Sequence, residues 1–287
     1  MVTEPTLADL DLFKEEEHEP FFWPGSGPAA LLVHGFPGTP AEMRPLATTL
    51  REQGWTTQGL LLPGFGSEIA SLYEHKPSQW VDHTRQAVVG LKADHHPVLL
   101  VGYSMGAAVS LQVAATSDAG AIPDGLVLLA PFWRIGTRLQ ALVWRSVSTI
   151  FRTIKPLRSV SFDDPRVREG VGGFLPDLNL DSPAVQQSLR NLKVPTSFIN
   201  RLLALGRASD EAAAQVSLPT LIIQGIDDQV MRPATTRQLL GHFPGPIRYV
   251  ELDADHELLT PGQAHWPQLI SALQHFTATL DVHHSEG

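Results

Sequence analysis

Six short, almost continuously apolar segments recur along this chain, and they alternate with segments whose apolar residues repeat at helical spacing. Continuous apolar runs of this length are typical of parallel strands that are buried on both faces. Strands that alternate with helices in sequence form a parallel sheet covered by helices on both faces. We therefore predict an α/β fold with strands at Ala29–His34, Thr56–Leu62, Val98–Gly102, Gly125–Ala130, Thr220–Gln224 and Ile247–Leu252.

Helix-start signals lie between several of these strands. The tetrapeptide Thr39-Pro40-Ala41-Glu42 has the pattern of a capping box with proline at the first helical position, so a helix is expected to begin there. The remaining periodic segments predict helices at Ser78–Ala93, Ser104–Ala115, Pro233–His242 and Ala264–Leu280.

One stretch, residues 132–218, interrupts the alternation. It holds no convincing strand, but helical patterns such as Leu139–Trp144 and Ser197–Leu205 are separated by turns rich in Pro, Gly and Asp. Structureless loops of this length are rare. We predict an inserted, mainly helical lid at 132–218, placed over the carboxyl edge of the sheet, where open α/β sheets bind ligands. Residues 1–131 and 219–287 then form one core domain.

The pentapeptide Gly102-Tyr103-Ser104-Met105-Gly106 lies between the third apolar run and a helical pattern. G-x-S-x-G in this context predicts a nucleophile elbow, a tight strand-to-helix turn that exposes the serine hydroxyl. The helix N-terminus beside that hydroxyl favours negative charge.

A serine hydroxyl is a weak nucleophile until a base takes its proton, and the base needs a carboxylate that orients it. Beyond a serine on such an elbow, the acid and then the histidine follow in chain order. Asp227 and Asp228 come just after the fifth predicted strand, and His256 comes just after the sixth. All of them are therefore expected at the same edge of the sheet as Ser104.

A serine hydrolase also needs N–H groups that bind the oxyanion of its intermediate. The loop His34-Gly35-Phe36-Pro37-Gly38 follows the first predicted strand, and its small, turn-prone residues allow the Phe36 N–H to point into the site. The N–H of Met105, the residue after the serine, is the second predicted donor. The side chains of both residues are expected to line the acyl pocket.

These motifs resemble those of the α/β-hydrolase superfamily, and within it those of bacterial monoacylglycerol lipases and related small carboxylesterases. The resemblance spans about residues 20–280, with 132–218 as an interruption. It rests on the segments His34–Leu46, Leu62–Gly66, Gly102–Gly106, Pro219–Gly225 with Asp228, and Asp255-His256. It implies an α/β-hydrolase fold and favours Asp228 over Asp227 as the acid. Phe65 departs from the family pattern, because many relatives carry His there.

Other features of the sequence restrict the partners and the location. The formal net charge of −9 argues against nucleic acid. The absence of cysteine excludes thiolate chemistry, and no His, Asp or Glu cluster has metal-ligand spacing, so we expect neither a metal nor another cofactor. The acidic N-terminal segment lacks the pattern of a signal peptide, and no apolar run is long enough to span a membrane. A cytoplasmic protein without an obligate protein partner is predicted.

The predicted lid differs from the rest of the chain in charge. Residues 132–218 carry twelve Lys and Arg residues against seven Asp and Glu residues. Arg138, Arg145 and Arg152 recur every seven residues among apolar ones, which predicts a helix with a basic stripe beside an apolar stripe. Either the apolar side covers the pocket while the arginines face water, or this face transiently contacts an anionic membrane surface.

Together these observations predict a serine carboxylic-ester hydrolase that acts on monoacylglycerols or other small acyl esters. Ser104, His256 and Asp228 are its predicted catalytic residues, and Phe36 and Met105 its oxyanion donors. A thioesterase or C–C bond hydrolase with the same three residues stays an alternative, as does a ligand-binding protein without catalysis, since one fold hosts many functions.

Overall fold

The computed structural model describes residues 12–134, 138–164, 167–168, 171 and 178–282. Seven strands form one sheet in the order β1-β3-β2-β4-β5-β8-β9, and every neighbouring pair is parallel except β1 with β3. The strands are β1 (Phe21–Trp23), β2 (Ala29–Val33), β3 (Thr56–Leu60), β4 (Val98–Tyr103), β5 (Gly125–Leu129), β8 (Thr220–Gly225) and β9 (Ile247–Leu252).

The six predicted strands correspond to the six parallel strands of this sheet, and β1 was missed. A three-residue strand is too short to show a period in the sequence. Phe21 of β1 is buried against Gly59 of β3, where a Cβ atom would lie only 2.1 Å from the phenyl ring. This close packing, which involves residues far apart in sequence, places β1 at the sheet edge.

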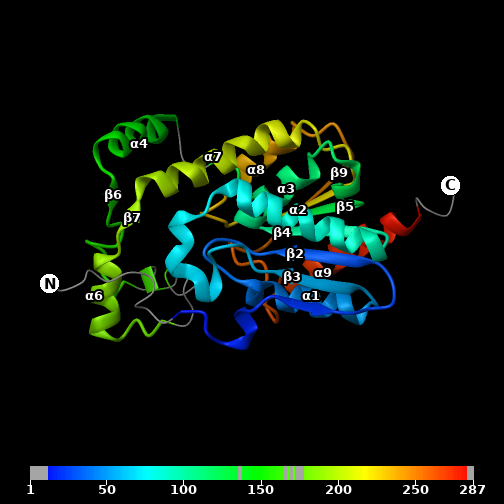
Figure 1. The fold of residues 1–287 in the computed structure, drawn as a ribbon, viewed down its shortest axis with the longest axis horizontal. Helices are drawn as coiled ribbons and strands as arrows, with labels where there is room; N and C mark the ends of the chain where they lie inside the picture. Colours follow the sequence, from blue (N-terminus) through cyan, green and yellow to red (C-terminus); the bar gives the residue numbers. More distant parts are fainter. Residues whose placement is uncertain (1–11, 135–137, 165–166, 169–170, 172–177, 283–287) are drawn as a thin grey trace.

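Helices cover both faces of the sheet, as Figure 1 shows. The apolar side chains of α1 and α9 join one hydrophobic core, and those of α2, α3, α7 and α8 join the core on the other face. These helices are α1 (Arg44–Glu52), α2 (Pro77–Asp94), α3 (Met105–Ala114), α7 (Thr196–Ala213), α8 (Pro233–Leu240) and α9 (Trp266–Val282). Short 3-10 helices are η2 (Glu16–His18), η3 (Pro40–Met43), η4 (Gly66–Glu74) and η5 (Ala119–Ala121). The architecture is the mostly parallel, two-faced sheet that the sequence predicts.

The predicted capping box at Thr39 is only half right. A helical turn does begin at Pro40, but it is the 3-10 helix η3, and α1 begins four residues later at Arg44. The Thr39 hydroxyl accepts a hydrogen bond from the Ala41 N–H. The carboxyl of Glu42 does not reach back to Thr39. It accepts a hydrogen bond from the N–H of Gly35 instead.

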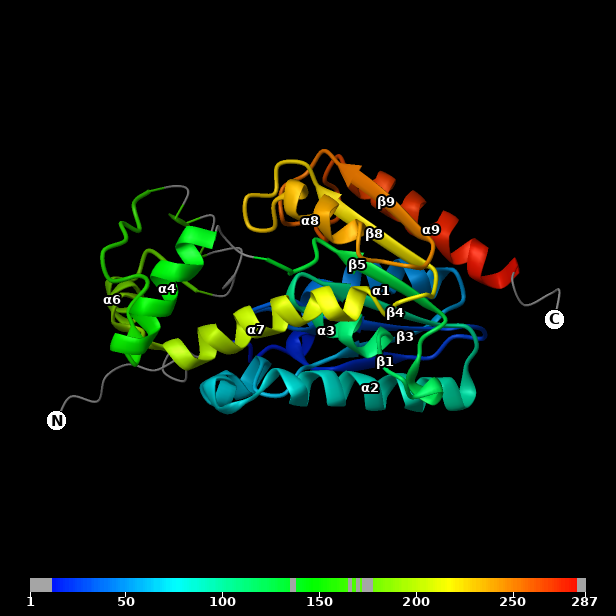
Figure 2. The same ribbon diagram turned by 90° about the horizontal axis from the view of Figure 1, so that it is seen from above.

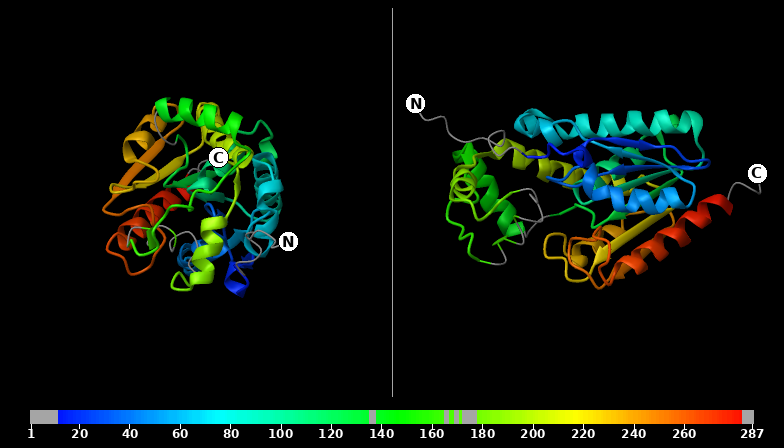
Figure 3. Two further views of the ribbon diagram at one scale, coloured as in Figure 1. Left: turned by 90° about the vertical axis from the view of Figure 1, so that its left-hand side faces the viewer. Right: turned by 90° about the horizontal axis from the view of Figure 1, so that it is seen from below.

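The segment between β5 and β8 contains the helices α4 (Arg138–Ile150), α6 (Pro183–Asn191) and α7. It also contains a minimal antiparallel pair, β6 (Thr153–Ile154) with β7 (Val194–Pro195), which the sequence did not indicate. Figures 2 and 3 show α4 and α6 beyond the end of the sheet, while α7 runs back along α3. Leu205, Ala212 and Ala213 of α7 belong to the same core as α3. The division of the chain into a core and a lid at 132–218 stays a prediction.

In the part of the chain that the structure describes, no helix combines the length and the apolar character needed to cross a bilayer. The cytoplasmic location stays a prediction.

Candidate active site

Ser104 lies at the turn between β4 and α3, in a backbone conformation that residues other than glycine rarely adopt. Its φ of 51° and ψ of −114° lie outside the regions favoured by L-residues. A Cβ atom at Gly102 would lie 2.4 Å from the Gly106 carbonyl oxygen, and one at Gly106 would lie 2.3 Å from the Val33 carbonyl oxygen. Both glycines are therefore required by the close passage of strand and helix, and the resulting turn presents the Ser104 hydroxyl beyond the strand end.

A continuous hydrogen-bonded chain links Ser104, His256 and Asp228. His256 Nε2 lies 3.1 Å from Ser104 Oγ, and its Nδ1 lies 2.8 Å from Asp228 Oδ2. The histidine side chain is 13% exposed, and the aspartate side chain is fully buried. The three predicted residues therefore meet, from three different loops, in an arrangement that allows a proton to pass from the serine to the imidazole.

Asp228 is held in place by several donors besides His256. Its Oδ1 accepts hydrogen bonds from the N–H groups of Val230 and Met231, at 2.8 and 2.7 Å. Its Oδ2 also accepts one from Nε2 of Gln224, at 2.9 Å. The neighbouring Asp227 is exposed to solvent, so the geometry pairs Asp228, and not Asp227, with the histidine.

Gln224 is a site residue that the sequence analysis did not single out. It is fully buried at the end of β8, and its amide also donates to the Met231 carbonyl, at 2.9 Å. The Thr236 hydroxyl of α8 donates to Gln224 Oε1, at 2.7 Å. A lone polar residue closing an otherwise apolar strand was the signal available, because a buried amide needs partners close by.

Tyr103 fixes the loop that carries His256. Its hydroxyl donates to the His256 carbonyl oxygen at 2.9 Å, and the two rings lie 5.5 Å apart. Burial raises the pKa of Tyr103 well above its usual range, and nearby carboxylates, Glu42 first among them, add to this effect. Tyr103 therefore remains a donor over the working pH range of a protein.

The backbone also brings the aspartate and histidine loops together at Gly225. A Cβ atom at that position would lie 2.0 Å from the Asp255 carbonyl oxygen. Only glycine permits this approach.

His34 organises the loop that precedes Phe36. It is fully buried, and burial lowers its pKa to about 4, so the imidazole is neutral at physiological pH. The neutral ring donates from Nδ1 to the Gly35 carbonyl at 2.8 Å, while Nε2 accepts the Leu62 N–H at 3.1 Å. Both ring nitrogens are thus occupied by backbone groups, which makes His34 a structural loop residue.

The two predicted oxyanion donors belong to different elements. Met105 is the first residue of α3, where the N–H has no acceptor within the helix. Phe36 belongs to the loop after β2, and its ring lies 6.2 Å from that of Phe65 and 5.8 Å from that of Phe198 on α7. The contact between Phe36 and Phe198 thus joins the loop after β2 to the segment between β5 and β8.

Phe65, the departure from the family pattern, is fully buried. Its ring packs edge-on against His34, with 4.9 Å between the ring centroids, and against Trp80 of α2 at 5.6 Å. Phe65 thus supports the His34 loop by packing.

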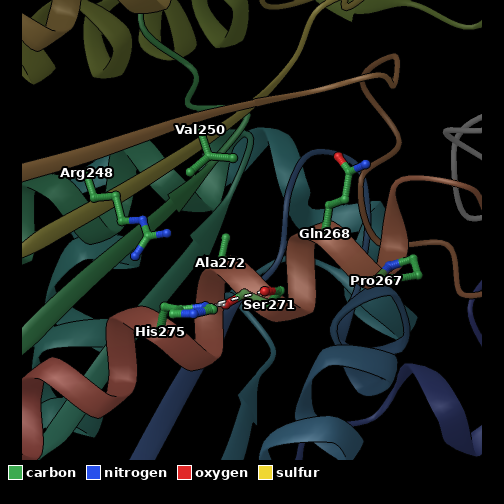
Figure 4. A pocket seen from close by; sticks show the side chains of 7 residues that line it. All are labelled: Arg248, Val250, Pro267, Gln268, Ser271, Ala272 and His275. Atoms are coloured by element: carbon green, nitrogen blue, oxygen red, sulfur yellow. Dashed lines mark hydrogen bonds between the residues drawn. The ribbon is translucent and has the colours of Figure 1, made fainter.

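A separate open pocket of about 330 Å³ lies between β9 and α9 (Figure 4). Its walls include Arg248 of β9 and Gln268, Ser271 and His275 of α9, and none of its lining residues is Ser104, Asp228 or His256. Among the described residues, no cluster of three or more His, Cys, Asp or Glu side chains has the geometry of a metal site.

Comparisons with known proteins agree with this geometry. A family model described as serine aminopeptidase, S33 matches residues 28–260. A thermostable monoacylglycerol lipase from Bacillus sp. (strain H-257) is 25% identical over 217 residues, covering 75% of this chain and 76% of the relative. A carboxylesterase from Bacillus subtilis (strain 168) is 30% identical over 99 residues, which are 34% of this chain and 40% of the relative.

Among solved structures, one reported for the metagenome-derived lipolytic enzymes LipS and LipT superposes with a TM-score of 0.66. It is 20% identical and covers 92% of this chain and 98% of its own, a likeness that bears on the fold alone. Together the matches confirm the resemblance found in the sequence and the α/β-hydrolase fold.

Proposed function

Because this chain belongs to the α/β-hydrolase family described as serine aminopeptidase, S33, we propose that it hydrolyses carboxylic esters, with monoacylglycerols as the preferred substrates. The observation that carries the proposal is the hydrogen-bonded chain Ser104–His256–Asp228 on a strained elbow. The similarity to a monoacylglycerol lipase over three quarters of both chains supports the choice of substrate.

In the first half of the reaction, Ser104 Oγ attacks the ester carbonyl carbon while His256 Nε2 takes the hydroxyl proton. The N–H groups of Phe36 and Met105 bind the negative oxygen of the tetrahedral intermediate. The intermediate collapses when the C–O bond to the alcohol breaks and His256 returns the proton to the leaving oxygen. For a monoacylglycerol the alcohol is glycerol, and the acyl group remains on Ser104.

In the second half, water attacks the acyl-enzyme. His256 takes a proton from the water and then returns it to Ser104 Oγ as the C–O bond to Ser104 breaks, which releases the fatty acid and restores the hydroxyl. Asp228 holds the imidazole tautomer and stabilises the imidazolium. No step needs a cofactor.

The test is the Ser104→Ala variant with p-nitrophenyl butyrate as substrate. We expect turnover to fall by about 10⁴–10⁶-fold while the protein stays folded. A folded Ser104→Ala protein with near-normal turnover would refute the mechanism. Labelling of Ser104 by a fluorophosphonate, lost in the same variant, would separate an enzyme from a ligand-binding protein that retains these residues.

A panel of monoacylglycerols, p-nitrophenyl esters and acyl-CoA thioesters over several chain lengths tests the substrate. Preference for acyl-CoA would favour the thioesterase alternative, and failure on all of them would favour a C–C bond hydrolase.

We also propose that α4 transiently contacts an anionic membrane surface and thereby admits acyl substrates. Val143 and Ile150 of α4 and the adjoining Phe151 are more than half exposed, and Arg145 and Arg152 beside them are exposed too. Exposed apolar side chains together with arginines are typical of a helix that lies on a lipid interface. The side chain of Arg138, which the sequence places on this helix, lies outside the described residues.

Charge reversal at Arg138, Arg145 and Arg152 tests this contact. A smaller fraction of the variant should sediment with anionic phosphatidylglycerol vesicles, while hydrolysis of p-nitrophenyl butyrate should stay at the wild-type rate. Vesicle binding that ignores the three reversals would rule the contact out.

A further inference from the structure

The carboxyl group of Glu42 lies against the loop that carries Phe36 and contacts both ends of it. The Gly35 N–H donates a hydrogen bond to Glu42 Oε1. At the other end of the loop, a Cβ atom added to Gly38 would lie 2.4 to 2.7 Å from the carboxyl atoms of Glu42. The loop from Gly35 to Gly38 is thus folded closely around one partly buried carboxyl group.

The same loop touches the candidate nucleophile. A Cβ atom at Gly35 would lie 3.1 Å from Ser104 Cβ, 3.3 Å from the Tyr103 ring and 3.4 Å from Glu42 Oε1. Gly35 is therefore wedged between the serine and the glutamate, and its N–H is one residue away from the Phe36 N–H. The two peptide groups share the Cα atom of Gly35, so a hydrogen bond that fixes the first restricts the orientation of the second.

We propose that Glu42 is a positioning residue, which aims the Phe36 N–H at the oxyanion through the hydrogen bond that Glu42 accepts from Gly35. This inference rests on the proposed function, since it assigns a task to the Phe36 N–H in ester hydrolysis. Glu42 touches no reacting atom and acts only through the loop.

The contribution of Glu42 comes from an acceptor oxygen and does not need a negative charge. Burial raises the pKa of Glu42 to about 7, and the charge of Glu257 adds to this effect, while the Gly35 hydrogen bond opposes it. A carboxylate, a carboxylic acid and a carboxamide all offer an oxygen that accepts an N–H. The structure therefore predicts that Gln at position 42 can accept the Gly35 N–H in place of Glu42, and that Ala cannot.

The first experiment compares Glu42→Gln and Glu42→Ala with p-nitrophenyl butyrate. Losing an oxyanion donor outright costs about 10²–10³ in turnover, so a misaimed donor in Glu42→Ala should lower kcat by about 10- to 100-fold with KM within about twofold. Glu42→Gln should keep kcat within about threefold of wild type. Glu52→Ala, which removes an exposed glutamate from the end of α1, is the matched control and should change neither constant.

A second experiment uses the predicted clash at Gly38. Gly38→Ala should push the Glu42 carboxyl away from the Gly35 N–H and lower kcat to about the level of Glu42→Ala. In the double variant the clash is gone, so the two losses should not multiply. Losses that multiply would mean that Gly38 and Glu42 act separately, and the proposal would fail.

Three further outcomes decide the case. Wild-type kcat in a folded Glu42→Ala protein, or a Glu42→Gln protein as slow as Glu42→Ala, would overturn the inference. If Glu42→Ala does not fold, as thermal unfolding would reveal, the kinetics of Glu42→Gln and Gly38→Ala decide it. Full activity of Ser104→Ala would instead overturn the proposed function, so the two failures are distinguishable.

Discussion

The Ser104 site and helix α4 differ sharply in how their side chains are held. At the site, Asp228 and Gln224 are fully buried and bonded to several partners each, and Ser104 is only 7% exposed. On α4, Ile150 is 73% exposed, and polar contacts such as the Trp144–Asn200 hydrogen bond link the helix to α7. Catalysis is thus predicted at a network of buried, hydrogen-bonded side chains, whereas the described side chains of α4 include exposed apolar ones.

Under the proposed function, this difference separates the residues that react with the substrate from those that admit it. Displacement of a catalytic group by about 1 Å strongly lowers the reaction rate, so such groups need neighbours that fix their side-chain rotamers. A helix that meets acyl chains or a lipid surface needs apolar side chains on its exposed face, because they bind those partners. Helix α7 links the two regions, because Phe198 lies beside Phe36 of the site loop and Asn200 accepts a hydrogen bond from Trp144 of α4.

After the loss of Ser104 itself, the largest expected effect is that of Asp228. Asp228→Asn keeps the shape of the side chain but should lower kcat by about 10⁴-fold, because the amide favours the wrong tautomer of His256. Asp227→Asn, at the exposed neighbouring residue, should leave kcat unchanged. Equal losses in both variants would break the assignment of the acid.

The next effect compares two phenylalanines in the same segment. Phe198→Ala on α7 removes a buried ring and should destabilise the protein by about 3–5 kcal/mol. Phe151→Ala, just after α4 and 55% exposed, should change the free energy of unfolding by less than about 0.5 kcal/mol. Urea unfolding of both variants measures the two losses. Equal losses in the free energy of unfolding would contradict this comparison.

A smaller effect is expected at Gln224, which orients Asp228 without touching substrate. Gln224→Ala should lower kcat by about 10- to 100-fold, because Asp228 Oδ2 loses one of its two partners while His256 remains. Gln229→Ala, at an exposed glutamine five residues later, is the matched control. An unchanged kcat in Gln224→Ala would show that the backbone N–H groups alone suffice.

The smallest effect is a pH dependence of stability at Glu42. Its pKa is raised from 4.5 to about 7 in the folded state, so the folded protein holds a proton that the unfolded chain releases. The stabilisation from this proton is full below pH 4.5 and disappears as the pH rises through 7.

Glu42→Gln, which has no charge to bury, should therefore gain in Tm relative to wild type on going from pH 5 to pH 8. The expected gain is about 2–4 °C, which corresponds to about 1 kcal/mol after solvent screening. Calorimetry at both pH values measures it, and a gain at pH 5 instead would reverse the sign of the proposed titration.

Much of the fold was accessible from the sequence because its signals are local. Six parallel strands were predicted from apolar runs, and the G-x-S-x-G context predicted the elbow at Ser104. The order of Ser104, Asp228 and His256 then followed from the position of each residue just after a strand. Short-range patterns of this kind predict the fold because the apolar residues that form them are also those that the core buries.

The features that escaped prediction depend on side-chain contacts that form only in the folded protein. The edge strand β1 exists because Phe21 packs on Gly59, and Gln224 has its role because Thr236 and Met231 surround its amide. No periodic pattern in the sequence marks such contacts.

Glu42 shows the boundary most clearly. The sequence by itself determined that a helical turn begins at Pro40 and that a serine, an acid and a histidine follow strands in order. Only the tertiary structure decided that the Glu42 carboxyl accepts the Gly35 N–H rather than capping its own turn. The reason is competition: a local cap must be satisfied within its turn, but folding brought a buried N–H from another loop to the same oxygen, and a buried donor left without a partner costs more.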